Sequence, residues 1–187
     1  MENILSVFLG LGLASAAGFR VFVPLLFTNI ASLLGYYHFG SGLQWMGTYT
    51  AFGILITATV LEVAAYYLPI VDNFLDTIGL PASVMAGTIL ATSLVEVNDP
   101  TLKWALGLIV GGGAAGIVQS GTSLLRIGST TTTGGLGNSV LATGENIFSV
   151  ILTLLSLVFP FLMAGCAFLF LVYILKKMFS KNKLTRN

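Results

Sequence analysis

The 187-residue chain carries a formal net charge of +1, and 56% of its residues are hydrophobic while only 8% are charged. Soluble domains have about 25% charged residues, so this composition excludes a soluble domain of any size. The near-neutral balance also excludes a basic surface for nucleic acid. At roughly 20 apolar residues per crossing, the chain has room for about six membrane segments. We therefore expect an all-α fold, a polytopic transmembrane helix bundle that forms one integral membrane domain over residues 1–187.

The expected segments follow the apolar runs and the residues that interrupt helices. The first run, about residues 4–34, is too long for one span, and Gly18, Arg20 and Pro24 interrupt it. This pattern predicts two short helices that meet at a break. Pro81 is expected to open the fourth segment. The predicted segments are residues 3–18, 20–36, 46–68, 80–96, 101–127 and 145–176, the last kinked at Pro160.

Basic residues indicate the orientation in the membrane. They cluster in the short tail 176–187, directly after the last segment. By the positive-inside rule this places the C-terminus in the cytoplasm, and six crossings place the N-terminus there too. Each half of the chain also has one arginine near a predicted break, Arg20 and Arg126. Such doubling suggests a weak internal repeat of the inverted kind that transporters use.

Three charged residues in or beside apolar segments, Glu62, Arg20 and Arg126, are the first candidates for function. Glu62 lies well inside its apolar segment, where a carboxylate costs about 2.5 to 3.5 kcal/mol unless it faces the bundle interior. It is expected to be either a proton or cation site, or a structural partner of Arg20 or Arg126. Arg20 itself lies at the first break, where a guanidinium and a freed helix end can hold an anionic group. The alternative for Arg20 is that it snorkels to the headgroups.

The last predicted helix has a polar stripe. Glu145, Ser149, Thr153, Ser156 and Pro160 follow one another at spacings that place them on one helical face. This face is expected to point toward protein or water and not toward lipid. Either a pore lining or hydroxyl bonds between helices explains it.

The segment between the last two helices is the most polar part of the chain. Asp99 and Pro100 predict the start of the preceding helix, which runs to about residue 127. Residues 128–144 then combine threonines and glycines, which favour an irregular or re-entrant segment, with an external loop as the alternative. If the segment enters the membrane, its solute-binding candidates are Thr132, Thr133, Gly134, Gly135 and Asn138.

Other motifs favour helix packing over chemistry. The glycine-rich run 111–116 has the spacing of a nucleotide-binding motif, but no strand precedes it. His38 and Cys166 are the sole histidine and cysteine, so we expect no metal site and no cofactor. Gly112, Gly116 and Ser120 form a row of small residues on the helix predicted over residues 101–127. We expect another helix to pack closely against the row, and this other helix could belong to a second subunit of a homodimer.

One pattern extends over nearly the whole chain: Gly18-Phe19-Arg20, Glu62 followed by Pro69 and Asp72, Arg126, Thr133-Gly134-Gly135-Leu136-Gly137-Asn138, and Glu145. With these residues the chain resembles a bacterial membrane family known only as domain of unknown function family 4126. The resemblance implies a small multi-pass protein of the bacterial inner membrane and no settled activity, cofactor or substrate. Ser139 departs from the proline expected after the asparagine, which puts the family's usual loop shape in doubt.

The function expected from these features is transport, as a channel or carrier for an ion or small solute. Interrupted helices, buried charges of both signs and a polar stripe are what a path through lipid requires. The arginines would suit an anionic or carbonyl-bearing solute, and the glutamates protons or cations. The first alternative is a non-catalytic membrane scaffold or assembly partner. The second is a membrane-embedded enzyme that modifies lipids, although the sequence contains no catalytic triad set.

Overall fold

The computed structural model describes residues 2–95 and 97–160 and scattered positions beyond them, with side chains left undescribed at a few helical residues. The described chain is helical throughout and contains no strand, which confirms the all-α prediction. The α-helices are α1 (Glu2–Ala17), α2 (Phe22–Leu33), α3 (Tyr49–Ala65), α4 (Pro69–Leu94), α5 (Pro100–Leu106), α6 (Gly113–Thr133) and α7 (Asn138–Val158). Two short segments complete the set, the 3-10 turn η1 (Gln44–Gly47) and the π-helical η2 (Gly107–Gly112).

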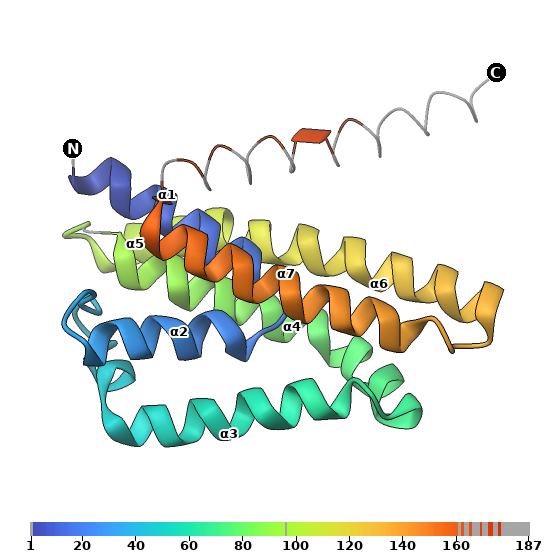
Figure 1. The fold of residues 1–187 in the computed structure, drawn as a ribbon. Helices are drawn as coiled ribbons and strands as arrows, with labels where there is room; N and C mark the ends of the chain where they lie inside the picture. Colours follow the sequence, from blue (N-terminus) through green and yellow to red (C-terminus); the bar gives the residue numbers. More distant parts are fainter. Residues whose placement is uncertain are drawn as a thin grey trace.

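Helices α1 and α2 form a hairpin inside the bundle (Figure 1). At its middle, α1 packs Gly10 against Ala91 near the end of α4, whereas Gly18, directly after α1, meets α6 at Ala115. The chain then reverses, and the connection after α2 returns to the end of α4, where Gly40 donates its N–H to the carbonyl oxygen of Ser93 at 3.0 Å. The break predicted in the first apolar run is confirmed. The two halves form one hairpin whose tip lies inside the bundle, and the number of membrane crossings stays a prediction.

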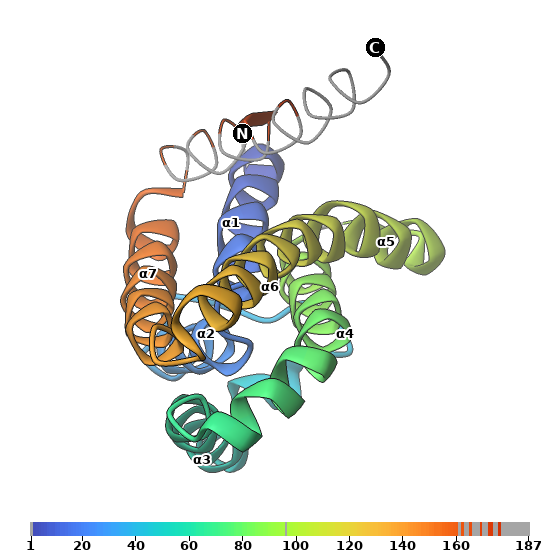
Figure 2. The same cartoon turned by 90° about the vertical axis from the view of Figure 1, so that its right-hand side faces the viewer.

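The remaining helices run along the length of the bundle and enclose the hairpin. Viewed nearly along the helices, α4, α6 and α7 surround α1, while α3 packs on α2 at the outer edge (Figure 2). The start of α5, which carries Lys103, lies at the same end as the start of α1, and α4 begins at the opposite end (Figure 1). Which end faces the cytoplasm stays a prediction, as does the inverted repeat.

The fourth segment begins earlier than predicted. It was expected over residues 80–96 with Pro81 at its start, but α4 begins at Pro69 and contains Pro81 in its interior. A proline removes one main-chain hydrogen bond, and Ser/Thr hydroxyls and neighbouring helices compensate for such losses in membrane helices. Ser83, which is fully buried two residues after Pro81, satisfies its own hydroxyl by donating to the carbonyl oxygen of Leu80 at 2.9 Å.

The expectation of an irregular segment over residues 128–144 is wrong. Helix α6 continues to Thr133 and α7 begins at Asn138, so only four residues form the turn between them. Within this helix the threonine hydroxyls are satisfied by carbonyl oxygens of the preceding turn, as Thr132 is by Gly128 at 2.8 Å. The turn itself uses the left-handed backbone of Gly134 (φ 64°) and Gly135 (φ 91°).

Other boundaries agree with the sequence. Asp99 caps α5 as predicted, because its carboxylate accepts the N–H groups of Thr101 and Leu102 at 2.7 and 3.1 Å. Helix α7 ends at Val158, directly before the kink predicted at Pro160. Most of residues 161–175 and all of residues 177–187 of the basic tail lie outside the described part of the chain.

Burial is reversed relative to a soluble protein. Large apolar side chains cover the outside, for example Leu61 on α3, Leu125 on α6 and Phe148 on α7, each about 60% exposed. Polar side chains are buried instead, among them Arg20, Arg126, Thr28, Asn29, Ser83, Ser149 and Thr153. Three described helical stretches are long and apolar enough to cross a membrane, Thr77–Leu94, Pro100–Thr133 and Asn138–Val158. The protein is therefore an integral membrane protein whose apolar surface faces lipid.

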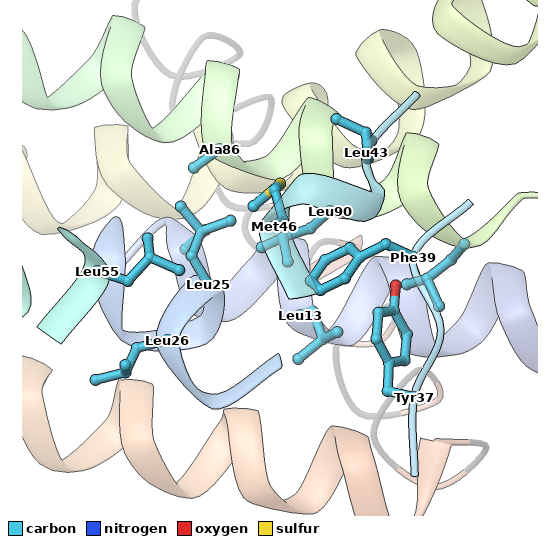
Figure 3. Close-up of a cluster of buried hydrophobic side chains, with 12 residues drawn as sticks. Leu13, Leu25, Leu26, Tyr37, Phe39, Leu43, Met46, Leu55, Ala86 and Leu90 are labelled. Carbon is cyan, nitrogen blue, oxygen red and sulfur yellow. The ribbon is translucent and has the colours of Figure 1, made fainter. Parts of the chain in front are cut away.

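A hydrophobic cluster packs between the hairpin, α4 and the connection after α2 (Figure 3). It joins Leu13 of α1 and Leu25 of α2 to Leu90 of α4. The connection between α2 and η1 inserts Tyr37 and Phe39 into it, with their rings edge to face at a centroid distance of 4.9 Å. This packing fixes both ends of the hairpin and so determines where its tip lies.

Candidate functional site

The candidate site begins at the tip of the α1–α2 hairpin. Gly18 lies so close to α6 that a Cβ atom there would approach the carbonyl oxygen of Ala115 to 2.6 Å. After it, Phe19 and Arg20 both donate N–H groups to the carbonyl oxygen of Ala16, at 3.0 and 3.2 Å. The glycine therefore lets a short non-helical stretch of main chain pack deep inside the bundle.

Glu62 binds the start of α2. Its two carboxylate oxygens accept the main-chain N–H groups of Val21 and Phe22 at 2.7 and 3.0 Å. These N–H groups have no partner within their own helix, and the positive end of the helix dipole favours a negative charge there. The predicted inward orientation of Glu62 is confirmed, since it is 9% exposed. Its hydrogen bonds go to main chain and not to either arginine, so the freed helix end expected to hold an anion holds this carboxylate.

Arg20 is 1% exposed, so it does not snorkel to the membrane surface. Its Nη1 atom lies 2.9 Å from Oε2 of Glu145, and its Nη2 atom donates to the carbonyl oxygen of Ala142 at 3.1 Å. Its Nε atom donates to Oδ1 of Asn146 at 2.5 Å. Three groups of α7 thus hold the guanidinium in one orientation.

Arg126 shares the carboxylate of Glu145. Its Nε atom donates to Oε1 at 3.2 Å and its Nη2 atom donates to Oε2, which makes the pair bidentate. The ring of Tyr66 stacks on both guanidiniums, with its centroid 3.8 Å from Cζ of Arg20 and 4.4 Å from Cζ of Arg126. We call Arg20, Glu62, Tyr66, Arg126 and Glu145 the ion cluster.

The ion cluster is charge-balanced and lies inside the bundle. Its two guanidiniums and two carboxylates cancel in formal charge, which limits the cost of burying them. At 1.5 Å per residue, Arg126 and Glu145 lie about 10 Å along their helices from the α6–α7 turn. The sequence did not assign Tyr66 or Asn146 to the site. The only signals for them were a tyrosine one turn after Glu62 and an amide next to Glu145.

The polar stripe of α7 continues from the ion cluster along the hairpin. Ser149, Thr153 and Ser156 are fully buried, which confirms that this face points away from lipid. The hydroxyl of Ser149 donates to the carbonyl oxygen of Ala16 in α1 at 3.1 Å. Thr153 donates to the carbonyl oxygen of Ser149 at 2.7 Å. The described contacts of the stripe are therefore contacts within protein.

The threonine and glycine candidates are not part of the ion cluster. Thr132 and Thr133 are exposed at the end of α6, and Gly134 and Gly135 form the turn. Asn138 is buried at the start of α7, where its Nδ2 atom donates to Oγ1 of Thr130 at 3.1 Å. The segment connects two helices at one end of the bundle, and a role for it in solute binding stays a prediction.

The row of small residues packs within the chain. A Cβ atom at Gly112 would lie 2.7 Å from Oγ1 of Thr88, and one at Gly116 would lie 3.1 Å from a methyl group of Val84, both in α4. Ser120 at the end of the row is exposed. The predicted close approach of a helix is confirmed, but the two glycines face α4 and are not available to a second subunit. The homodimer stays a prediction, but Gly112 and Gly116 do not provide its interface.

Fold and site together define a class of protein: an all-helical integral membrane protein in which the tip of a helical hairpin packs on buried charges inside the bundle. The chain matches the family described as Domain of unknown function (DUF4126) over residues 7–179, and it belongs to that family. This confirms the resemblance seen in the sequence. No curated protein and no solved structure matches the chain.

Proposed function

We propose that this protein is a small membrane transport protein whose solute site is the ion cluster at the tip of the α1–α2 hairpin. One observation carries the proposal. A break in the main chain, at Gly18 to Val21, lies inside the bundle in contact with charged side chains of both signs. Broken helices and buried ionisable residues mark the binding sites of many membrane transporters.

The contacts favour a small anion as the solute. The start of α2 and the guanidinium of Arg20 are both groups that bind anions, and carboxylates of the chain now occupy them. Glu62 is the exchangeable carboxylate, since it is held by two main-chain N–H groups alone, whereas Glu145 is held by two guanidiniums. If Glu62 takes up a proton and an anion replaces it at Val21 and Phe22, the cluster stays neutral. Movement of the anion would then be coupled to movement of a proton.

The test is flux into proteoliposomes that contain the purified protein. Uptake of chloride, nitrate and formate is measured with and without a pH gradient, and sodium and potassium are the cation probes. Glu62→Gln removes the exchangeable charge at constant size, and Arg20→Gln removes one guanidinium. Thr57→Val is the matched control, because Thr57 lies on the exposed face of α3 and bonds only its own helix, at Gly53.

We expect anion uptake by the wild type and by Thr57→Val, and at least tenfold slower uptake by Arg20→Gln. Glu62→Gln is expected to lose the response to the pH gradient, because its amide cannot exchange a proton. Each variant is first shown to be folded by its elution and its thermal unfolding in detergent. Uptake of cations instead of anions would refute the anion assignment, and no uptake of any probe would refute transport.

A non-catalytic scaffold is the second candidate, and one observation favours it. The arginines and glutamates of the ion cluster bind one another and the main chain, so they hold α1, α2, α3, α6 and α7 together. A scaffold needs only this pairing. It predicts that the folded wild type gives no flux and that cluster variants lose stability alone.

A further inference from the structure

A polar cavity lies far from the ion cluster, at the end of the bundle where α1 begins. It has a volume of about 510 Å³ and is bounded by the connection after α2, the end of α4 and the start of α5. Its apolar wall includes Leu9 and Leu94. Its polar lining includes Tyr36, His38, Ser41, Asn98 and Lys103. The transport proposal uses none of these residues.

The wall of the cavity is held in place by the hydrophobic core. Along residues 36–39 the side chains alternate, because Tyr37 and Phe39 are each 6% exposed while Tyr36 and His38 point outward. The hydroxyl groups of Tyr37 and Ser93 lie 2.9 Å apart, which ties this stretch to α4. A ligand therefore meets a largely formed site, and little ordering free energy is lost on binding.

The cavity offers donors to an anionic ligand. The ammonium of Lys103 lies over the connection, since a Cβ atom at Gly40 would be 3.0 Å from its Nζ. Lys103 is the only Lys or Arg among the described lining residues, and the ring of His38 and the amide of Asn98 add further donors. The nearby carboxylate of Asp99 already accepts two N–H groups at the start of α5.

Exposed aromatic residues place the cavity at the membrane interface. Tyr36 is 86% exposed, Trp45 60% and Trp104 49%, and all three belong to segments at this end of the bundle (Figure 1). Tyr and Trp gather at the depth of lipid headgroups, where one side of the ring is apolar and the other is wet. The depth, the lysine and the mixed apolar and polar lining together match a phosphate group at the membrane surface.

We propose that this cavity binds a phosphate group through Lys103, His38 and Asn98. The phosphate belongs either to a phospholipid headgroup or to a water-soluble phosphate ester. Both sources present the same oxygens to the ammonium, and they differ in whether acyl chains extend beside the bundle. The inference is independent of transport, because it concerns a different end of the molecule.

Native mass spectrometry of the full chain in detergent tests the proposal. The protein is titrated with phosphatidylglycerol, with diacylglycerol of the same acyl chains, and with glycerol phosphate. Lys103→Met removes the charge at similar length, and Lys103→Arg retains it. We expect Lys103→Met to weaken binding of the phosphate ligand at least tenfold and Lys103→Arg to stay within about threefold, as loss of one charge-assisted contact implies.

Each outcome decides the proposal. Binding of phosphatidylglycerol but not glycerol phosphate identifies a lipid headgroup as the ligand. Binding of both identifies the phosphate group itself. Either result supports the proposed site if Lys103→Met weakens the binding. Equal binding of diacylglycerol and phosphatidylglycerol, or equal affinity of Lys103→Met and wild type, overturns it. Should Lys103→Met fail to fold, His38→Gln provides the same comparison, with an expected loss of a few-fold.

Discussion

Removal of the shared carboxylate of the ion cluster is the sharpest test of the structure. Glu145 is the partner of both Arg20 and Arg126, which are 1% and 2% exposed. Glu145→Gln keeps the size of the side chain and removes its charge. Two guanidiniums that stack on one tyrosine ring then lose the carboxylate that they share.

The size of the effect follows from this geometry. Breaking a buried ion pair by removing one partner costs about 3 to 5 kcal/mol, because the remaining charge is left buried. Glu145→Gln leaves two such charges, so we expect a loss of at least about 3 kcal/mol in the free energy of unfolding. Arg126→Gln should cost less, about 1 to 3 kcal/mol, since Glu145 keeps Arg20 at 2.9 Å. The loss expected for Glu145→Gln is a substantial part of the free energy of unfolding of a folded protein, which is typically about 5 to 15 kcal/mol.

The assay is reversible unfolding in mixed micelles, with the two single variants and the double variant measured as a cycle. In the Arg126→Gln background, Glu145→Gln is expected to cost at least about 1 kcal/mol less than in the wild type, because one orphaned charge is already gone. The reasoning is refuted if Glu145→Gln stays within about 0.5 kcal/mol of the wild type, or if Arg126→Gln is the more damaging of the two.

Three further predictions concern packing and ionisation. Gly18→Ala should lower the free energy of unfolding by about 1 to 3 kcal/mol because its Cβ atom would overlap α6, whereas Gly113→Ala, with nothing within 4 Å, should be neutral or stabilising in the same assay. Ser149→Ala should cost about 0.6 to 2 kcal/mol through its lost bond to α1, and the exposed control Ser120→Ala should change little; equal effects would contradict the interhelical role. Burial raises the pKa of Tyr37 above its ordinary 10.0, so its contribution to stability is complete below about pH 10 and is lost as the pH rises further. Thermal unfolding across that range should show a smaller alkaline loss for Tyr37→Phe, and an unchanged loss would contradict the assignment.

Local signals predicted most of the individual elements. The helix start at Asp99 and the break at Gly18 depend on neighbouring residues alone, and both occur where the sequence places them. The inward orientation of Glu62 also follows from local chemistry, because lipid cannot solvate a carboxylate. Pro81 and the threonines before Gly134 misled the prediction. Residue propensities measured in water overstate their effect where hydroxyls and neighbouring helices satisfy the main chain.

The partners of the charged residues depend on contacts between distant parts of the chain. The sequence indicated that Glu62 needs a partner and proposed an arginine, but α3 packs on α2 so that its carboxylate reaches Val21 and Phe22 instead. Arg20 likewise could have paired with either glutamate, and the position of α7 selects Glu145.

Composition by itself determined that this is a helical membrane protein, because 8% charged residues cannot form a water-facing surface and only helices satisfy the main chain of such a sequence in lipid. The small residues and buried charges also showed that close helix contacts and an interior polar site must exist. Only the tertiary structure decided that the first apolar run is a hairpin inside the bundle and that its tip packs on a balanced ion cluster. The reason is that hydropathy reports how much of a segment is apolar, whereas the direction in which a broken helix resumes depends on packing against α4, α6 and α7.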